Sequence, residues 1–222
     1  DISSKPLDFI SHVLGDEASG SLFAYLKAKG WVSNLIAGSG IEGQNFKDFN
    51  INLQLTESGL TQQQDIINAA FYVIEILKEA AKEEWRLQEK AKLNQLARQY
   101  DDSHKPLQAI SELAELHQYF SWGDIAKACI SETLTQQSLC DALAYFTPAN
   151  MRVKVIARGV HTTKRCAYYD AAYAIEPYTE QQRAAWQTPS PVQAIFMSPP
   201  NPFIGDSYSL CKNEAQYALP QQ

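Results

Sequence analysis

Apolar residues near the start of the chain recur every three or four positions, which is the spacing of one face of an α-helix. A first set lies at positions 9–14 and a second set at positions 22–26. Glycines separate the two sets, and Gly30 follows the second. We therefore predict two helices between residues 6 and 30, and we expect Gly30 to end the second in the left-handed conformation that glycine tolerates.

A period of two replaces the helical spacing in residues 31–56. The apolar residues that alternate with polar ones are Phe49, Ile51, Leu53 and Leu55. Such alternation is typical of an antiparallel strand with one buried face. A compact apolar run at 32–38 precedes it, so the pattern predicts a hairpin over residues 31–56, with the glycine-rich stretch 38–43 as its turn.

Helical spacing returns after residue 60. Thr61 and Gln64 have the spacing of a capping box, in which each side chain caps a backbone N–H of the other, so we predict a helix that starts there. Further helices are predicted at residues 82–100, from Pro106 toward residue 119, and at residues 135–146. Residues 151–155 read Met-Arg-Val-Lys-Val, and this alternation predicts a third strand.

The order of these elements, a hairpin followed by helices and then a strand, is typical of the α+β class. We expect an antiparallel or mixed sheet with helices packed on one face. From residue 189 onward prolines become frequent, which favours an extended tail over a helix or a strand. The predicted organisation is one domain over residues 1–188 and an extended, Pro-rich tail over residues 189–222.

The composition limits the classes of partner. The 222 residues are 45% hydrophobic and 20% charged, which is typical of a chain with a packed core. With 19 Lys and Arg against 25 Asp and Glu, the net charge is −6, which excludes a typical nucleic-acid-binding surface. No apolar run reaches the roughly 20 residues of a membrane span, so no membrane partner is expected. The first residues contain neither Met nor a signal-peptide core, and we expect a piece of a longer protein.

The histidines supply no known catalytic motif, and H-x-x-E-H is absent. The closest approach to a metal site is His12 with Asp16 on one helix face, with Glu84 or Glu89 as a third ligand. The alternative is an ordinary capped helix end near Gly15, and it is the favoured interpretation. We therefore predict no catalytic residue, no metal and no cofactor in this chain.

The cysteines are Cys129, Cys140, Cys166 and Cys211. No pair has C-x-x-C spacing, which excludes a disulfide scaffold and a cysteine zinc site. We interpret them as core or incidental thiols, and their even number leaves a disulfide open. Lys164 and Arg165 precede Cys166, and neighbouring cations lower a thiol pKa, but an inert thiol is favoured because the spacing places no histidine beside it.

Residues 9–22 read FISHVLGDEASGSL and resemble the H-L-L-G-H-E-G-x-G-S-L segment of the insulysin and pitrilysin zinc peptidases. Those long chains repeat one α+β unit four times, and the segment belongs to the second unit. Further segments similar to that unit, in the same order, lie at 26–32, 55–60, 84–85, 93–94 and 199–204. The chain departs from the family pattern at Asp16, where His is common, and at Ala37, where a Gly-Gly pair is usual. The resemblance covers nearly the whole chain.

The resemblance implies a non-catalytic unit of a longer peptidase, in which an earlier unit holds zinc through H-x-x-E-H and a distant Glu. Zinc is then expected in the full-length protein. The second unit forms a wall of the substrate chamber and offers a strand edge to the N-terminal end of a peptide. The residues to which the resemblance assigns this contact are Leu35, Ile36, Ala37, Gly38, Ser39 and Gly40. Small residues among them let a peptide backbone approach, although an ordinary hairpin turn is the alternative interpretation of this stretch.

Two functions follow from the resemblance. The first is a chamber-forming, substrate-holding unit of a zinc metallopeptidase, with neighbouring domains of the same polypeptide and peptide substrates as its partners. The alternative is a structural or interaction domain that supports the catalytic unit without touching substrate. The compartment stays open, because bacterial pitrilysin-like members are periplasmic and insulysin-like members are mainly cytosolic.

Overall fold

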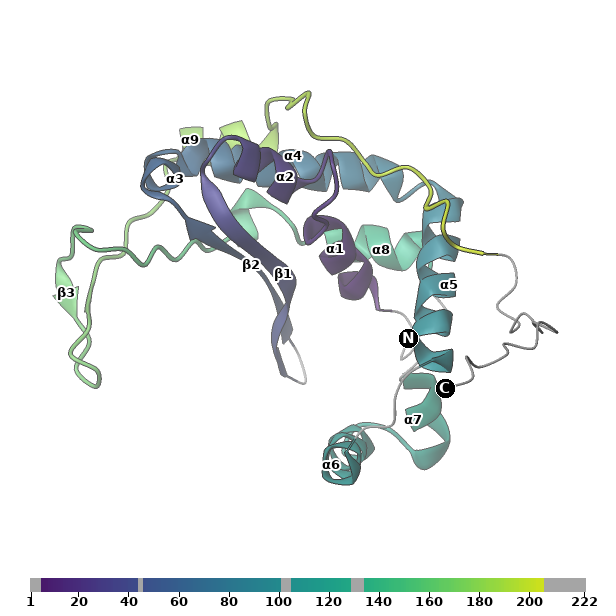
Figure 1. Cartoon of the computed structure of the whole chain (residues 1–222). Coiled ribbons are helices and arrows are strands. Elements are labelled where there is room, and N and C mark those ends of the chain that lie inside the picture. Colours follow the sequence, from purple (N-terminus) through teal and green to yellow (C-terminus); the bar gives the residue numbers. More distant parts are fainter. Residues whose placement is uncertain (1–4, 44–45, 101–104, 129–133, 206–222) are drawn as a thin grey trace, which may run out of the picture.

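The computed structural model describes residues 5–43, 46–100, 105–128 and 134–205 (Figure 1). The helices are α1 (Pro6–Leu14), α2 (Leu22–Ala28), α3 (Glu57–Thr61), α4 (Gln63–Ala80), α5 (Glu84–Gln99), α6 (Pro106–His117), α7 (Trp122–Ala128), α8 (Gln136–Leu143) and α9 (Glu180–Gln187). The strands are β1 (Val32–Gly43), β2 (Phe46–Leu55), β3 (Lys164–Arg165) and β4 (Ala172–Tyr173). The α+β class is confirmed. The described strands form two separate antiparallel pairs rather than one larger sheet.

The two predicted N-terminal helices are confirmed as α1 and α2. Pro6 opens α1, where its missing N–H leaves no hydrogen bond unmade. Ser21 caps α2, because its side chain accepts a hydrogen bond from the N–H of Ala24 at 3.1 Å. Gly30 follows α2 with a φ of +71°, which is the left-handed conformation predicted for it. The chain can therefore leave α2 and enter β1 almost at once.

The hairpin predicted over residues 31–56 is confirmed as β1 paired antiparallel with β2. The register places Ala37 opposite Ile51. The prediction that residues 38–43 form the turn is wrong, since β1 continues to Gly43. Glycine weakens a strand without preventing its pairing, and a register shift within this stretch accommodates the irregular backbone.

The alternation predicted for β2 is confirmed. The side chains that pack against the core are Phe49, Ile51, Leu53 and Leu55. Their polar neighbours are exposed, except for Asp48, which is partly buried. The apolar residues are half-buried rather than buried, because no third strand widens this sheet within the described residues.

The long helix predicted after residue 60 is confirmed as α4, and it supplies much of the core. Its buried residues are Ile66, Ala69, Phe71, Val73, Ile74, Leu77 and Ala80. The capping box predicted from Thr61 and Gln64 is wrong, because α4 begins at Gln63 without a side-chain cap. Thr61 instead ends the short helix α3, and its hydroxyl donates to the carbonyl of Ser58 at 2.8 Å.

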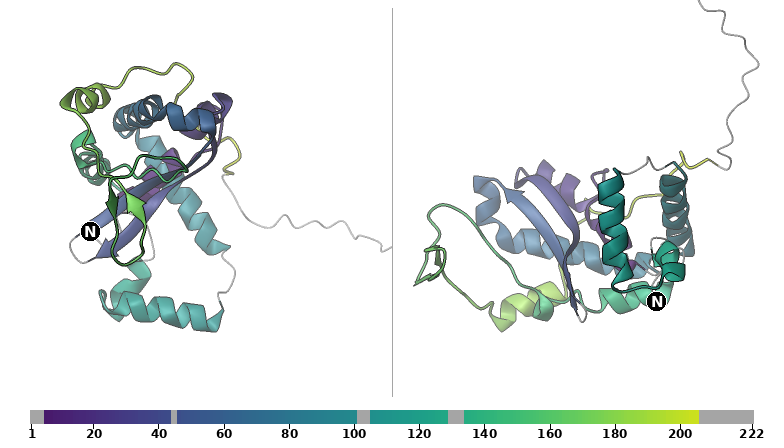
Figure 2. Two further views of the ribbon diagram at one scale, coloured as in Figure 1. Left: turned by 90° about the vertical axis from the view of Figure 1, so that its left-hand side faces the viewer. Right: turned by 90° about the horizontal axis from the view of Figure 1, so that it is seen from below.

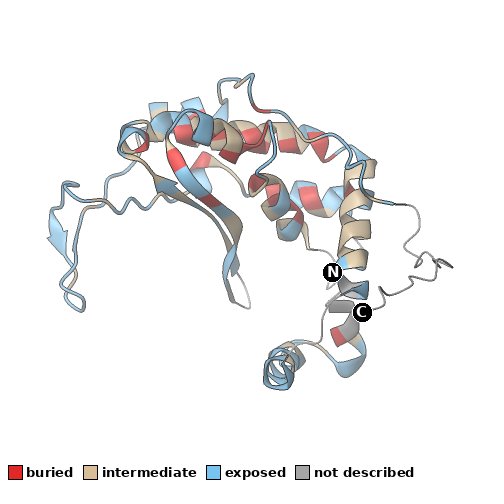
Figure 3. Cartoon of the chain, in the orientation of Figure 1, coloured by how far each residue is buried: buried red, intermediate tan, exposed pale blue. Residues whose placement is uncertain are grey.

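The remaining predicted helices are confirmed as α5, α6 and α8. Thr135 caps α8 in a reciprocal pair with Ser138. Buried positions are concentrated on α1, α2, α4 and α8 and on the part of the hairpin nearest α4 (Figure 3). In the left view of Figure 2, α6 and α7 lie below the rest of the chain, and α6 has no buried residue.

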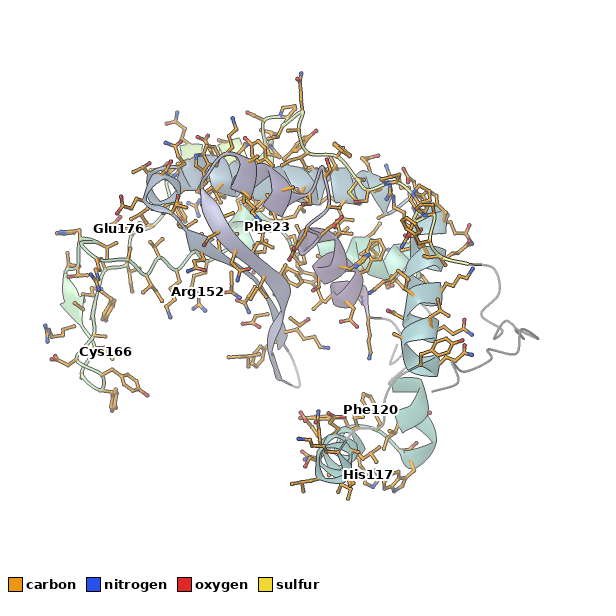
Figure 4. All side chains as sticks on the ribbon, in the orientation of Figure 1. Phe23, His117, Phe120, Arg152, Cys166 and Glu176 are labelled. Carbon is orange, nitrogen blue, oxygen red and sulfur yellow. The ribbon has the colours of Figure 1, made fainter. Side chains whose placement is uncertain are left out.

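The third strand predicted at residues 151–155 is wrong, because these residues form neither helix nor strand. They lead into an arm, residues 156–177, that extends away from the helices and carries the short pair of β3 and β4 (Figures 1 and 4). A strand needs a neighbour to satisfy its N–H and C=O groups. No described strand pairs with residues 151–155, so the alternating sequence alone does not make a strand there.

Residues 189–205 form no helix or strand, yet they are attached to the helices at several points (Figure 1). The side chain of Asn68 on α4 donates to the carbonyl of Ser190 at 3.1 Å and accepts from its N–H at 2.9 Å. Ile195 is 4% exposed and belongs to the core. The remaining residues of the predicted tail, 206–222, lie outside the described residues, so the tail as a whole stays a prediction.

Candidate functional site

A groove of about 460 Å³ lies between the C-terminal end of α1 and β1. Its lining residues are Ser11, His12, Gly15, Asp16, Glu17, Leu35, Ile36 and Ala37. None of them belongs to β2, so the groove follows the edge of β1 that faces away from β2. Within the described residues β1 pairs with β2 alone, and this second edge has no strand beside it.

Three of the six residues predicted to contact substrate line this groove. Leu35 is 6% exposed and anchors β1 in the core, whereas Ile36 is 60% exposed. Ala37, also in the groove, is half-buried. Gly38 borders the groove, since a Cβ on this residue would lie 3.6 Å from the hydroxyl oxygen of Ser11.

The other two predicted residues, Ser39 and Gly40, are exposed and lie outside the groove. The face of Gly40 is occupied by the side chains of Asp48 and Asn50, which a Cβ would overlap. This glycine therefore makes room for side chains of β2. Packing against β2 therefore explains why position 40 is a glycine, and the sequence pattern did not indicate this reason.

A side-chain hydrogen bond links the end of α1 to β1, beside the core contacts that these elements share. The hydroxyl of Ser11 donates to the carbonyl oxygen of Ala37 at 2.8 Å, a contact that typically contributes about 1 kcal/mol. Gly15 follows α1, and its N–H donates to the carbonyl of Ser11 at 2.8 Å. A Cβ on Gly15 would lie only 2.9 Å from that same carbonyl oxygen, so glycine lets the chain turn tightly beside the strand edge.

The sequence did not predict the second wall of the groove as part of the site. This wall is formed by Ser11, His12, Gly15, Asp16 and Glu17. His12 and Asp16 were considered as metal ligands and as caps of a helix end. All five residues belong to the segment 9–22 that carries the family resemblance. That segment is the signal from which the wall could have been inferred.

The carboxylate of Asp16 accepts two hydrogen bonds. One carboxylate oxygen accepts from the N–H of Ala18 at 2.8 Å, which folds the loop after α1 into a tight turn. The other accepts from the hydroxyl of Ser198 at 2.7 Å. Among the described residues no group of three or more His, Cys, Asp or Glu side chains is placed to hold a metal ion. The pair of His12 and Asp16 therefore does not fit a zinc site here.

Behind the groove lies a smaller inner cavity of about 70 Å³. His12 and Asp16 line both spaces. The His12 residue as a whole is exposed, but partial burial of its imidazole lowers the imidazole pKa, and the ammonium group of Lys90 lowers it further. The carboxylates of Asp16 and Glu89 act in the opposite direction without reversing this shift. His12 is therefore neutral at pH 7 and can donate or accept a hydrogen bond in the groove.

This pKa shift predicts an acid-sensitive stability. Because the folded-state pKa of His12 lies below the unfolded value of about 6.5, the unfolded chain binds more protons between these two values, and stability falls as the pH drops through about 6.5. We expect His12→Gln to reduce the loss of Tm between pH 7.5 and pH 5. His161→Gln, on the exposed arm, is the control and should leave that loss unchanged. An equal loss of Tm in wild type and His12→Gln would contradict the prediction.

Among the cysteines, Cys166 has a lowered thiol pKa whose cause differs from the one that the sequence suggested. Cys140 and Cys166 are free thiols, while Cys129 and Cys211 lie outside the described residues. The thiol pKa of Cys166 is lowered by hydrogen bonds from the backbone N–H groups of Tyr169 and Tyr168. The neighbouring Lys164 and Arg165 are not the cause of the shift.

Two family models match the sequence of this chain. One, described as the middle or third domain of peptidase M16, matches residues 98–222, and the other, described as the peptidase M16 inactive domain, matches residues 3–93. The chain belongs to the M16 peptidase family. It is a non-catalytic part of an insulysin- and pitrilysin-type protein, as the resemblance implied. The two M16 matches meet within α5, and the predicted division into residues 1–188 and 189–222 stays a prediction.

Individual M16 relatives cover nearly all of the chain. Insulin-degrading enzyme of Homo sapiens is 28% identical over 216 residues, which are 96% of this chain and 21% of that protein. The A-factor-processing enzyme of Saccharomyces cerevisiae is 28% identical over 213 residues, which are 94% of this chain and 20% of that protein. The crystal structure of pitrilysin superposes with a TM-score of 0.84 at 24% identity, covering 98% of this chain and 23% of that chain, and shows the same fold. The chain thus spans about a fifth of the length of these relatives.

Among the helices of the described residues, none is long and apolar enough to cross a bilayer.

Proposed function

We propose that this chain forms a wall of the substrate chamber in a zinc metalloendopeptidase and holds the N-terminal end of a peptide substrate by strand addition. The observation that supports this proposal is the groove along Leu35, Ile36 and Ala37, beside a strand edge that has no partner strand in the described residues. An extended peptide laid on such an edge gains main-chain hydrogen bonds and needs no particular side chains.

The orientation of Ala37 suits this role. In an antiparallel strand the N–H and C=O of one residue point to the same side. The Ala37 carbonyl accepts from Ser11 of α1, on the groove side, so we expect the Ala37 N–H to face the groove as well. A carbonyl oxygen has two lone pairs, so this one can accept a second hydrogen bond from a peptide. The small side chain of Ala37 leaves the edge accessible.

The polar wall of the groove suits the end of a peptide. Glu17 is exposed and lines the groove, and its carboxylate attracts the α-ammonium group of a peptide N-terminus. His12 is neutral at pH 7 and does not oppose that ammonium group. The groove therefore favours a free N-terminal end over an internal segment of the peptide.

Catalysis belongs to another part of the full-length polypeptide in this proposal. The sequence contains no H-x-x-E-H motif, and the family resemblance places the zinc ligands in an earlier unit. The zinc ion would supply Lewis-acid activation of water there. This chain contributes substrate capture, which raises the local concentration of the scissile segment near the catalytic unit.

A structural role without substrate contact is the second candidate. The observation that favours it is the exposed apolar side of α6, where Leu107, Ile110 and Leu113 are all exposed. Such a surface fits contact with neighbouring parts of the same polypeptide. Because α6 and the groove lie on different elements, a contact at α6 does not decide whether the groove holds substrate.

Ala37→Pro in the full-length enzyme tests the capture role. Proline removes the N–H that faces the groove, so we expect kcat/KM to fall about tenfold for peptides long enough to reach both the groove and the zinc. Short peptides that never reach the groove should keep their kcat/KM. The comparison is kinetic, with thermal melting to show that the fold is intact.

Ala37→Gly is the matched variant for this experiment, because it changes the same side chain and keeps the N–H. It should retain most of the kcat/KM for long peptides. If long and short peptides lose kcat/KM equally with Ala37→Pro, or if neither does, the capture role is wrong and the structural role stands.

A further inference from the structure

A strap formed by residues 195–201 crosses the loop that follows α1 and ends against α5. The N–H of Phe196 donates to the carbonyl of Gly20 at 3.0 Å. The ring of Phe196 covers Gly20, which has a φ of +88° and no room for a Cβ. At the far end, the N–H of Asn201 donates to the carboxylate of Glu89 on α5 at 2.8 Å. The strap is thus anchored at both ends, independently of its middle.

The middle of the strap is Ser198, which forms hydrogen bonds on two sides. Its carbonyl accepts from the guanidinium of Arg86 on α5 at 2.7 Å. Arg86 is itself paired with Glu83 at 2.8 Å and has a largely buried side chain. The Ser198 hydroxyl donates to Asp16 at 2.7 Å, across 182 positions of sequence. Since the main chain of Ser198 is fixed by Arg86, its hydroxyl can fix Asp16.

Asp16 connects this strap to the peptide groove. It lines both the inner cavity, together with Ser198, and the groove, together with Ala37. The other hydrogen bond of its carboxylate, from the N–H of Ala18, is local to the loop. The Asp16 N–H donates to the carbonyl of Val13 on α1 at 3.4 Å, which places the main chain but leaves the carboxylate to be held by Ser198. The contact with Ser198 therefore links the Asp16 carboxylate, through Arg86, to α5.

We propose that Ser198 is a positioning residue for the peptide groove: by donating to Asp16 it fixes the Asp16 carboxylate in the wall beside β1, in the orientation that admits one extended peptide. The inference rests on the proposed capture function and deepens it. Ser198 itself does not line the groove, so it acts through Asp16. A charge-assisted hydrogen bond of this length is among the stronger side-chain contacts, and its loss lets the Asp16 carboxylate change its orientation.

The test uses the full-length enzyme with Ser198→Ala, Ser198→Thr, Asp16→Ala and the double variant with alanine at both positions. Ser198→Ala should lower kcat/KM for long peptides about three- to tenfold and leave short peptides unchanged. Ser198→Thr keeps the hydroxyl and should restore the long-peptide value. In the Asp16→Ala background, removing the Ser198 hydroxyl should have little further effect, because the partner is already gone.

Ser190→Ala is the matched control, since Ser190 is exposed and contacts Asn68 through its main chain. It should leave both substrates unchanged. The anchors at Phe196, Arg86 and Asn201 remain in Ser198→Ala, so the strap should stay attached. If Tm nevertheless falls by more than about 5 °C, Ser198→Cys, which keeps the shape and weakens the donor, gives the same comparison.

Equal losses for long and short peptides, no loss, or fully additive effects of Ser198→Ala and Asp16→Ala would overturn the positioning role. Ala37→Pro, measured in parallel, separates this result from a failure of the capture function. If Ala37→Pro weakens long peptides while Ser198→Ala does not, only the role of Ser198 is wrong. If neither variant affects long peptides, the groove does not capture substrate.

Discussion

Replacing Gly59 by alanine is expected to lower the free energy of unfolding by about 3 kcal/mol or more. Gly59 is buried in α3, and a Cβ on it would overlap the main chain of Trp31 at its carbonyl group. That carbonyl accepts hydrogen bonds from the N–H of Thr56 at 3.0 Å and from its hydroxyl at 3.3 Å. Because the obstacle is hydrogen-bonded backbone, no side-chain rotation relieves the overlap.

Urea unfolding of the chain measures this loss, and two other glycines serve as controls. Gly123→Ala on α7 should change stability by less than about 0.5 kcal/mol, since its Cβ would meet only the hydroxyl of Ser121, at 4.0 Å. Gly30→Ala meets nothing within 4 Å but keeps a φ of +71°, so we expect about 1 kcal/mol from backbone strain. A loss for Gly59→Ala no larger than that for Gly30→Ala would show that the Trp31 contact does not limit stability.

Local patterns predicted the local elements well, because helices and tight hairpins depend on neighbours a few positions apart. The spacing of apolar residues placed α1, α2, α4 and α8, and the alternation in β2 placed its core face. Two of the errors have non-local causes. Residues 151–155 alternate as a strand does, but no described strand pairs with them. Residues 38–43 contain turn-forming glycines, but β2 continues beside them and extends β1.

The candidate site was predictable only on one side. The family resemblance pointed to Leu35, Ile36 and Ala37, and the structure places these residues along a groove. The opposite wall depends on Asp16, whose partner Ser198 lies 182 positions away. A contact of this kind leaves no periodicity and no local spacing in the sequence. It arises only when the core brings α1, α5 and the strap together.

The core that brings these elements together should depend strongly on Leu77. This residue lies on α4, is 0% exposed, and belongs to the cluster shared by α1, α8 and the hairpin. Leu77→Ala removes buried apolar contacts and leaves a cavity that a close-packed interior closes only in part. We expect the free energy of unfolding to fall by about 3 to 5 kcal/mol, measured by urea unfolding at constant m-value.

Leu107→Ala is the matched control, because it makes the same chemical change on α6, where the side chain is 79% exposed. It should cost less than about 0.5 kcal/mol in the chain alone. A loss below about 1 kcal/mol for Leu77→Ala would mean that the site is not fully packed. Destabilisation of the full-length protein by Leu107→Ala, with the chain alone spared, would show that the exposed side of α6 is buried against another part of that polypeptide, which is what the structural role requires.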